Sequence, residues 1–256
     1  MIKVYVMSAF CEGDAGGNLA GLVFCERVLS AEAMMEISKR LGYSETAFIL
    51  PSDQADFKLL FYTPTDEVPL CGHATIASFS SMFYLGKIGE GTYSIETGAG
   101  ILSVSVDADG LVMMEQNLPD YLDQIMDEEI LPIMGEGTRD GKFPVQIMTT
   151  GLRDILYPVK DEETLMALKP DFSGMTRLSK QKEVVGVHAF TLNHGYEGVD
   201  CVCRNFAPLY GIDEESATGT SNCALAGYLY HYREKKKRYV FFQGLNMGLP
   251  SRIFVH

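Results

Sequence analysis

The sequence predicts an α+β protein of two pseudo-symmetric halves, each a β-barrel-like sheet wrapped around a central buried helix. Strand patterns recur in the same order in both halves. Each half also contains one helical segment that is apolar or small on every side, preceded by a Gly-containing loop at 70–75 or 217–221. Because a helix that is hydrophobic all round must be covered on all sides, we expect a sheet curled around it. We place the halves at residues 1–117 and 118–256, with the last strand allowed to return to the first half.

In the first half, period-two alternation with β-branched and aromatic residues predicts the strands. They lie near residues 2–9, 21–25, 47–51, 57–63, 92–96, 101–106 and 111–116. Between the second and third of these, Ser30 as N-cap and Gly42 as the stop enclose an amphipathic helix. The segment 73–85 lacks a polar face, which predicts the enclosed helix of this half.

The second half repeats this order, so an internal duplication is the economical explanation. Its strands are predicted near residues 144–149, 154–159, 186–192, 199–206, 238–243 and 252–255. Polar helical patterns cover 161–168 and 175–182, and the nearly all-apolar helix covers 220–232. The turn-rich, acidic stretch 117–143 is the best candidate for the connection between the halves.

Composition excludes several classes of protein. The 256 residues carry 21 Lys+Arg against 34 Asp+Glu, a net charge of −13, which argues against nucleic-acid binding. No apolar run approaches the roughly 18 residues of a membrane span, and the N-terminus lacks the pattern of a secretory signal. The six cysteines show no metal-type spacing, and neither GxGxxG nor GxxxxGK[ST] occurs. We therefore expect a cytoplasmic protein with reduced thiols, no metal and no organic cofactor.

The starts of the two enclosed helices are candidate anion sites. Gly72 and Gly219 stand where unpaired backbone N–H groups and the positive end of a helix dipole would meet a ligand, most simply a substrate carboxylate. The alternative is that both glycines only make tight turns. His73 opens the first helix and Glu215 precedes the second, so both are candidates for polar contacts with the same ligand.

Glu45 is the most unusual carboxylate of the chain. It falls where a helix has stopped and an apolar strand begins, which puts its side chain close to a core. Burial makes a carboxyl group easier to protonate and suits it for general acid–base chemistry. A purely structural carboxylate stays open as the alternative.

Short motifs run through the chain from near its start almost to its end. They are Asn18–Gly21, Ser44–Phe48, Thr63–Thr75, Thr150–Asp154, Arg204–Thr220, and Gln243-Gly244 with Met247-Gly248. In this order they resemble the phenazine-biosynthesis PhzF-like family, and the block that ends in CGHAT is the most specific. The resemblance implies the fold of diaminopimelate epimerase, with residues of both halves lining one cleft.

The resemblance also implies a cofactor-independent isomerase, a homodimer, that moves a proton on a small carboxylate-bearing metabolite. Glu45 matches the catalytic glutamate of the family, and Gly72 and His73 match substrate-contacting positions. Glu215 falls where the family usually has Asp, and Thr220 where it usually has Ser. The other expected substrate-binding residues are Asn18, Thr218 and Gly219.

Two departures and two alternatives accompany this interpretation. The family's usual Arg appears as Leu60 and as Leu249, which points to a different substrate. Related racemases use two facing cysteines, but the second position here is Thr218, so Cys71 has no thiol partner for a two-base inversion. A proline-racemase-like epimerase or dehydratase that uses Cys71 stays open, as does a small-molecule-binding protein without catalysis.

Overall fold

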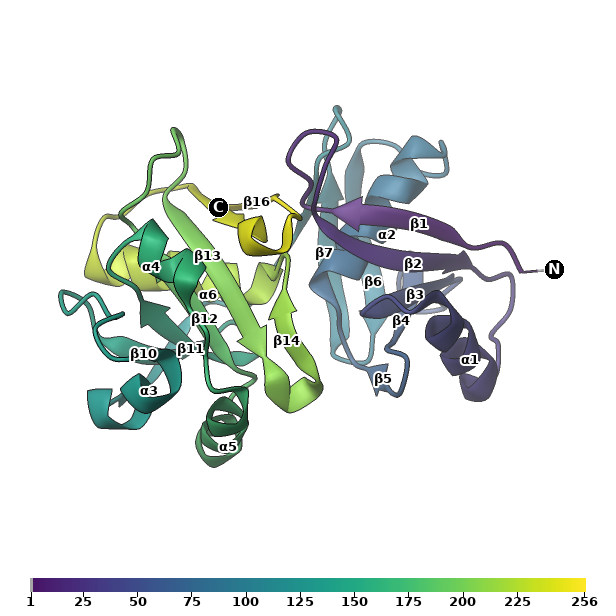
Figure 1. Cartoon of the computed structure of the whole chain (residues 1–256). Helices are drawn as coiled ribbons and strands as arrows, with labels where there is room; N and C mark the ends of the chain where they lie inside the picture. The colour runs from purple at the N-terminus through teal and green to yellow at the C-terminus, as the bar shows by residue number, and fades with distance from the viewer. Residues whose placement is uncertain (1) are drawn as a thin grey trace. The chain divides into compact units, whose positions relative to one another are not determined.

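The computed structural model describes residues 2–256, and the chain divides into two compact units. The first unit runs to Ala9 and resumes over Asn18–Glu115; the second comprises Phe10–Gly17 and Gln116–His256. Each unit holds one eight-stranded sheet among the described residues (Figure 1). The predicted α+β class is confirmed.

The first unit follows the predicted element order. Its elements are β1 (Tyr5–Ala9), β2 (Asn18–Phe24), α1 (Ala31–Leu41), β3 (Glu45–Leu50), β4 (Phe57–Tyr62), β5 (Glu67–Val68), α2 (Gly72–Tyr84), β6 (Gly91–Thr97), β7 (Gly100–Val106) and β8 (Val112–Met114). The predicted caps of α1 are confirmed. The Ser30 hydroxyl accepts from the Ala33 N–H, and Gly42 ends the helix at φ 70°, which glycine adopts without strain.

Helix α2 is the enclosed helix of the first unit. It contacts β1, β2 and β3 near one end of the strand order and β8 at the other, so the sheet curls around it (Figure 1). Ala74, Ala77 and Phe79 are fully buried on different sides of the helix. This explains why its sequence lacks a polar face.

The second unit contains the remaining elements. They are β9 (Asp120–Ile125), α3 (Asp127–Met134), β10 (Val145–Thr149), β11 (Arg153–Pro158), α4 (Glu162–Ala167), α5 (Phe172–Lys182), β12 (Val187–Thr191), β13 (Cys201–Ala207), β14 (Ile212–Glu215), α6 (Gly219–Tyr232), β15 (Tyr239–Gln243) and β16 (Ser251–Val255), with 3-10 turns at Pro208–Tyr210 and Leu245–Met247. Helix α6 contacts β10, β11 and β16, again strands from both sides of the sheet order. Strand β16 pairs with β15 inside this sheet.

The two sheets repeat one pattern of pairing. Along the first unit β1–β2 is antiparallel, β2–β3 parallel, β3–β4 antiparallel, β4–β6 parallel and β6–β7 antiparallel. The series β10, β11, β12, β13, β15 and β16 has the same alternation. The short strands β5 and β14 pair with β4 and β13 just before α2 and α6. The topology therefore carries the internal duplication that the strand order predicted.

The interpretation of 117–143 as a turn-rich connection was wrong, because this stretch contains β9 and α3. Strand β9 lies at the sheet edge and buries only Ile125, so its sequence lacks apolar alternation. Pro132 inside α3 cannot donate a helical hydrogen bond, which hides the helix from a pattern search. Within residues 2–256, no helix is long and apolar enough to cross a membrane.

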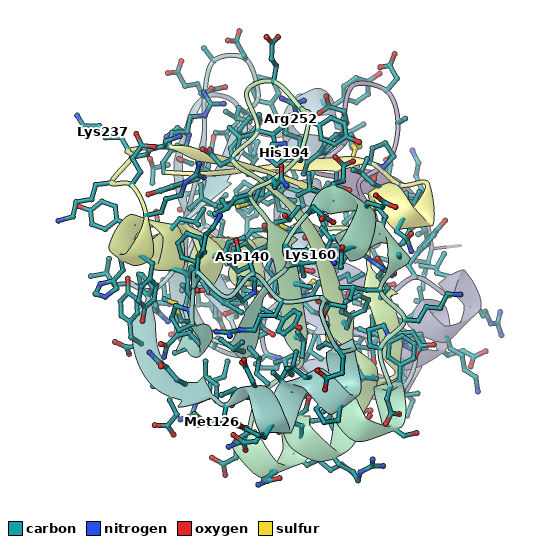
Figure 2. The ribbon with its side chains drawn as sticks, turned by 60° about the vertical axis from the view of Figure 1, so that its left-hand side comes forward. Met126, Asp140, Lys160, His194, Lys237 and Arg252 are labelled. Atoms are coloured by element: carbon teal, nitrogen blue, oxygen red, sulfur yellow. The ribbon has the colours of Figure 1, made fainter. Side chains whose placement is uncertain are left out.

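The loop between β1 and β2 belongs to the second unit. Gly17 N–H donates to Pro250 O, and a Cβ at Gly16 would lie 1.9 Å from the same oxygen, at a positive φ of 74°. Glu12 receives two hydrogen bonds from Arg252, which is labelled in Figure 2, at 2.6 and 2.7 Å. Glycine at position 16 and this ion pair hold the loop against the β16 end of the second unit.

Candidate active site

In the first unit, Glu45, Cys71 and His73 form one cluster. Glu45 is the first residue of β3, Cys71 is the N-cap of α2 and His73 lies in its first turn. His73 Nε2 lies 3.5 Å from Glu45 Oε2, and His73 Nδ1 lies 3.3 Å from Cys71 Sγ. The imidazole ring therefore stands between a carboxylate and a thiol.

Burial decides the charge state of this imidazole. His73 is only 5% exposed, and removal from water lowers its pKa, while the negative charge of Glu45 opposes the effect in part. The ring is therefore neutral near pH 7. Glu45 keeps 15% of its side chain exposed, yet its Oε2 atom is buried and has no hydrogen-bond partner. A buried carboxylate oxygen that no group satisfies is available for a proton or a ligand.

Gly72 and Asn18 complete the predicted residues of the first unit. Apart from its chain neighbours and the nearby backbone of its own helix, a Cβ at Gly72 would meet no atom within 4 Å. Cys71 makes no side-chain hydrogen bond that caps this helix. Asn18 is the first residue of β2, and Ala20, two residues later, pairs with Glu45 of β3. Because side chains two residues apart lie on one face of a sheet, Asn18 and Glu45 point to the same face at the same end of this sheet.

In the second unit, Glu215 and Thr218 are joined at the start of α6. Thr218 Oγ1 donates to Glu215 Oε2 at 2.6 Å and accepts from Gln243 Nε2 at 3.1 Å. Gln243 Oε1 accepts from the Thr218 N–H at 3.2 Å and from Asn222 Nδ2 at 2.8 Å. The amide of Gln243, fully buried, thus locks the position of the Glu215 carboxylate through Thr218. Gln243 was not predicted as a site residue, because its Gln-Gly motif does not reveal which groups the side chain contacts.

Gly219 and Thr220 follow in the first turn of α6. A Cβ at Gly219 would lie 3.5 Å from the Phe10 ring, and Thr220 O accepts a hydrogen bond from Thr150 Oγ1 at 3.1 Å. Both residues are half-buried. The structure therefore brings Glu215, Thr218, Gly219 and Thr220 together at one helix start, as it brings Asn18, Glu45, Gly72 and His73 together in the first unit. The single cleft lined by both groups stays a prediction.

A second group of hydrogen-bonded polar side chains is buried between α6 and the sheet, and the sequence did not predict it. Ser221 Oγ donates to Asp154 Oδ2 at 2.6 Å and accepts from Asn205 Nδ2, which also lies 3.1 Å from His188 Nδ1. All four residues are buried. Burial raises the pKa of Asp154 to about 6 and lowers the pKa of His188 to about 4. No periodicity could reveal this group, because its members come from β11, β12, β13 and α6.

The duplication shows that only one unit carries a carboxylate at the position of Glu45. The β3–β4 and β12–β13 ladders begin at corresponding pairs, whose first members are Thr46 and Val187. The residue before Thr46 is Glu45, whereas the residue before Val187 is Gly186. A Cβ at Gly186 would lie 1.9 Å from Phe206 O, so this position accepts no side chain.

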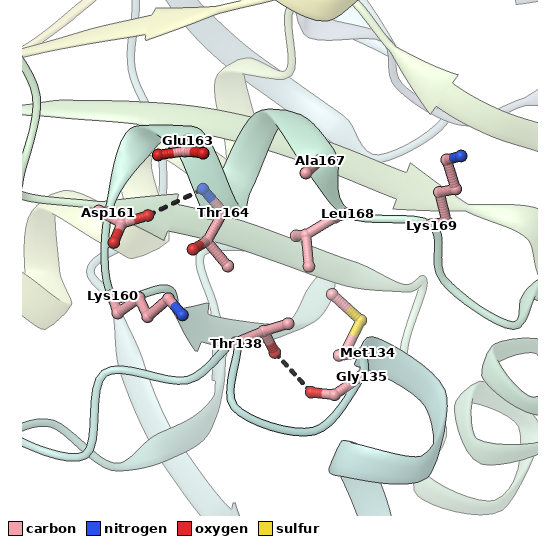
Figure 3. A pocket seen from close by; sticks show the side chains of 10 residues that line it. All are labelled: Met134, Gly135, Thr138, Lys160, Asp161, Glu163, Thr164, Ala167, Leu168 and Lys169. Carbon is pink, nitrogen blue, oxygen red and sulfur yellow. Dashed lines mark hydrogen bonds between the residues drawn. The ribbon is translucent and has the colours of Figure 1, made fainter.

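A pocket of about 460 Å³ lies elsewhere in the second unit (Figure 3). Its walls come from the end of α3 and from α4, and they include Thr138, Lys160 and Asp161. Thr138 donates to Gly135 O and Asp161 accepts from the Thr164 N–H, so these polar groups serve the local turns. None of the predicted site residues lines this pocket.

Comparisons with known proteins agree with the fold and the motifs. The sequence profile of the phenazine biosynthesis-like protein family (PhzC-PhzF) matches residues 7–256. The uncharacterized isomerase YddE of Escherichia coli (strain K12) is 34% identical over 238 residues, 90% of this chain and 80% of that protein. Trans-2,3-dihydro-3-hydroxyanthranilate isomerase of Pseudomonas aeruginosa is 25% identical over 261 residues, 99% of this chain and 90% of that enzyme.

A solved structure extends the likeness to three dimensions. The Bacillus anthracis phenazine biosynthesis protein of the PhzF family matches with a TM-score of 0.89 at 28% identity, over 98% of this chain and 88% of that one. The resemblance drawn from the motifs is thereby confirmed. The chain belongs to the phenazine biosynthesis-like protein family, as an enzyme of the isomerase class.

Proposed function

We propose that this protein is a cofactor-independent isomerase in which Glu45 moves a proton on a small carboxylate-bearing metabolite. The observation that carries the proposal is the buried Glu45 Oε2, which has no hydrogen-bond partner and faces the imidazole of His73. A carboxyl group in such surroundings can both accept and return a proton. The P. aeruginosa relative named above is also an isomerase of a carboxylate-bearing ring compound by its name.

The duplication supports a mechanism with one base. Stereoinversion by two bases needs a proton-accepting group on each side of the reacting carbon. Here Gly186 stands at the position that corresponds to Glu45, and Thr218 at the position that corresponds to Cys71, as N-cap of the second enclosed helix. Neither can act as a base near neutral pH. Glu45 must therefore take the proton and return it.

In the proposed reaction Glu45 removes a proton from one carbon, and the electrons of the broken C–H bond form a new double bond to the neighbouring carbon. The electrons of the original double bond move to the carbon at its far end. The protonated Glu45 then gives the same proton to the carbon at the far end of this system, so substrate and product have one elemental composition. The neutral His73 orients Glu45 and the substrate. The start of α2 at Gly72 stabilises the substrate carboxylate through its N–H groups and dipole.

The second unit is proposed to bind substrate through the start of α6. Glu215, held by Thr218, contributes negative charge, and Gly219 and Thr220 contribute N–H and hydroxyl donors. Asn18 is proposed as a further substrate contact. A homodimer in the cytoplasm is part of the same proposal, and light scattering on the purified protein tests the dimer.

The test is a screen of small carboxylates incubated with the protein in deuterated water, followed by NMR and mass spectrometry. In ordinary water the product should have the same mass as the substrate. In deuterated water NMR should show that a hydrogen or deuterium atom has moved to a carbon that did not carry it in the substrate. Both results together support the proposal. Glu45→Gln must slow its formation by about 10²–10⁴-fold. A product whose composition differs from the substrate, by hydration or by electron transfer, would overturn the proposed reaction.

A second candidate is a Cys71-dependent epimerase or dehydratase. It is favoured by the 3.3 Å separation of Cys71 Sγ and His73 Nδ1, because a neighbouring imidazole can promote formation of a thiolate. Loss of turnover in Cys71→Ser, with turnover kept in Glu45→Gln, would support this candidate over the first.

A further inference from the structure

We propose that Glu45, Cys71 and His73 bind Zn²⁺, and that the bound metal inhibits the enzyme by occupying its proton-transferring carboxylate. The binding part rests on the cluster alone, whereas the inhibition rests on the proposed role of Glu45. This metal differs from a required cofactor, because turnover by Glu45 needs the metal to be absent.

The donor atoms have the right kinds and spacing. One oxygen, one sulfur and one nitrogen, each from a different residue, all lie within 4.8 Å of one another. Zinc binds such atoms at roughly 2.0–2.3 Å, which puts tetrahedral donors about 3.5 Å apart. Cys71 and Glu45 lie beside different nitrogens of the His73 ring, so one of these two side chains must rotate toward the nitrogen that binds the metal. A set with thiolate and imidazole ligands favours Zn²⁺ over the oxygen-seeking ions Mg²⁺ and Ca²⁺.

An independent observation points to a ligand at the same place. Glu45 Oε2 is buried without a hydrogen-bond partner, and a carboxylate oxygen left in this state costs free energy that a cation would recover. His73, at 5% exposed, is already held in the cluster by its packing, so little side-chain entropy is lost when it binds a metal.

The cluster supplies three protein ligands, one fewer than the four of tetrahedral zinc. Apart from Cys71, His73 and the nearby backbone of α2, no atom lies within 4 Å of a Cβ placed at Gly72. Three protein ligands with an open position are the pattern of zinc sites that accept water or a substrate group. On binding, the Cys71 thiol loses its proton to solvent and its sulfur forms the metal bond, with no change of oxidation state. All three ligands belong to the first unit, so the site needs no residue of the second.

Cobalt titration of the full-length, metal-free protein tests the binding. Co²⁺ should produce the visible bands of a four-coordinate ion and an ultraviolet thiolate-to-cobalt band at one equivalent, and Zn²⁺ should abolish both. Cys71→Ser should lose the thiolate band, and Glu45→Gln and His73→Gln should each weaken Zn²⁺ binding at least about tenfold. Circular dichroism and the Tm of each variant show whether it is folded.

Cys25→Ser and Cys11→Ser are the matched controls, since Cys25 is a half-buried thiol and Cys11 an exposed one, and neither belongs to the cluster. Both should keep the spectrum of the parent protein. A thiolate band that persists in Cys71→Ser, or the absence of any such band in the parent, overturns the proposed site.

Activity separates this inference from the proposed function. With a substrate in hand, Zn²⁺ should inhibit at the concentration at which it displaces Co²⁺, and EDTA should restore full turnover. Saturating Zn²⁺ without effect on turnover overturns the inhibition. If Co²⁺ binds as expected while Glu45→Gln turns over normally, the proposed function fails and the metal site stands.

Discussion

The Nε2 atom of His73 lies 3.5 Å from the Oε2 atom of Glu45, although the two residues come from the first turn of a helix and the first position of a strand. The imidazole is buried and the carboxylate oxygen beside it has no hydrogen-bond partner. This pair defines the chemistry proposed for the first unit and the first test of it.

Glu45→Gln should bind substrate nearly normally and turn it over about 10²–10⁴ times more slowly, because the change keeps the shape and deletes the base. Steady-state kinetics, with binding followed by calorimetry, measures both effects. Turnover within about threefold of the parent would show that another group is the base.

Cys71→Ser should keep most of the turnover under the leading proposal, since Cys71 serves there only as N-cap of α2 and neighbour of His73. Ser keeps a small polar side chain at this position. A loss of more than about a hundredfold in kcat, at unchanged Tm, would instead favour the Cys71-dependent reaction.

Thr218→Val should raise KM more than it lowers kcat. The variant removes the hydroxyl that donates to Glu215 Oε2 at 2.6 Å and so releases this carboxylate from its position. Thr218→Ser keeps the hydroxyl and is the control, with kinetics expected close to the parent. Equal kinetics in Val and Ser variants would remove Glu215 from the proposed substrate contacts.

The buried group of polar side chains under α6 should shape the pH dependence of stability. The pKa of His188 falls from 6.5 to about 4 on folding, so the unfolded chain binds more protons below pH 6.5 and stability is lost as pH falls toward 4. The pKa of Asp154 rises from 3.8 to about 6, so stability is gained over much of the same interval. Each of these two pKa shifts changes the free energy of unfolding by about 3 kcal/mol over this interval, and the two changes have opposite signs.

Asp154→Asn should expose the contribution of His188, because it removes the opposing titration and leaves an oxygen to accept from Ser221. Urea unfolding between pH 7 and pH 4 should then show a steeper loss of stability than in the parent, by about 3 kcal/mol over the interval. His188→Gln should show the reverse. An unchanged slope in Asp154→Asn would mean that this carboxyl group is ionised in the folded protein.

Gly186→Ala should destabilise the protein by about 3 kcal/mol or more, because its Cβ would lie 1.9 Å from the backbone oxygen of Phe206. Gly195→Ala is the matched control, since a Cβ there meets no atom within 4 Å, and its effect should stay within about 0.5 kcal/mol. Chemical denaturation measures both. Similar stability of the two variants would contradict the close approach of β12 and β13 at Gly186.

The helices and strands of this protein can be predicted from its sequence where a local pattern of side chains indicates a helix end or a buried face. The caps Ser30 and Gly42 mark α1 because a hydroxyl and a positive φ satisfy the helix ends locally. The all-apolar stretches of α2 and α6 predict enclosure because every side of each helix is buried. Strand β9 and helix α3 escape prediction, since an exposed edge strand and a helix with an internal proline lack such patterns.

The sequence by itself determined that Glu45 and His73 would each lie at the boundary between a core and the start of an element, through hydrophobic periodicity and the family motifs. Only the tertiary structure decided that Glu45 meets Cys71 and His73 in one cluster, and that Gln243 holds Thr218. The physical reason is that the curl of each sheet around its helix brings together residues far apart in the chain. Periodicity records whether a residue is buried, but it does not record which residue lies opposite.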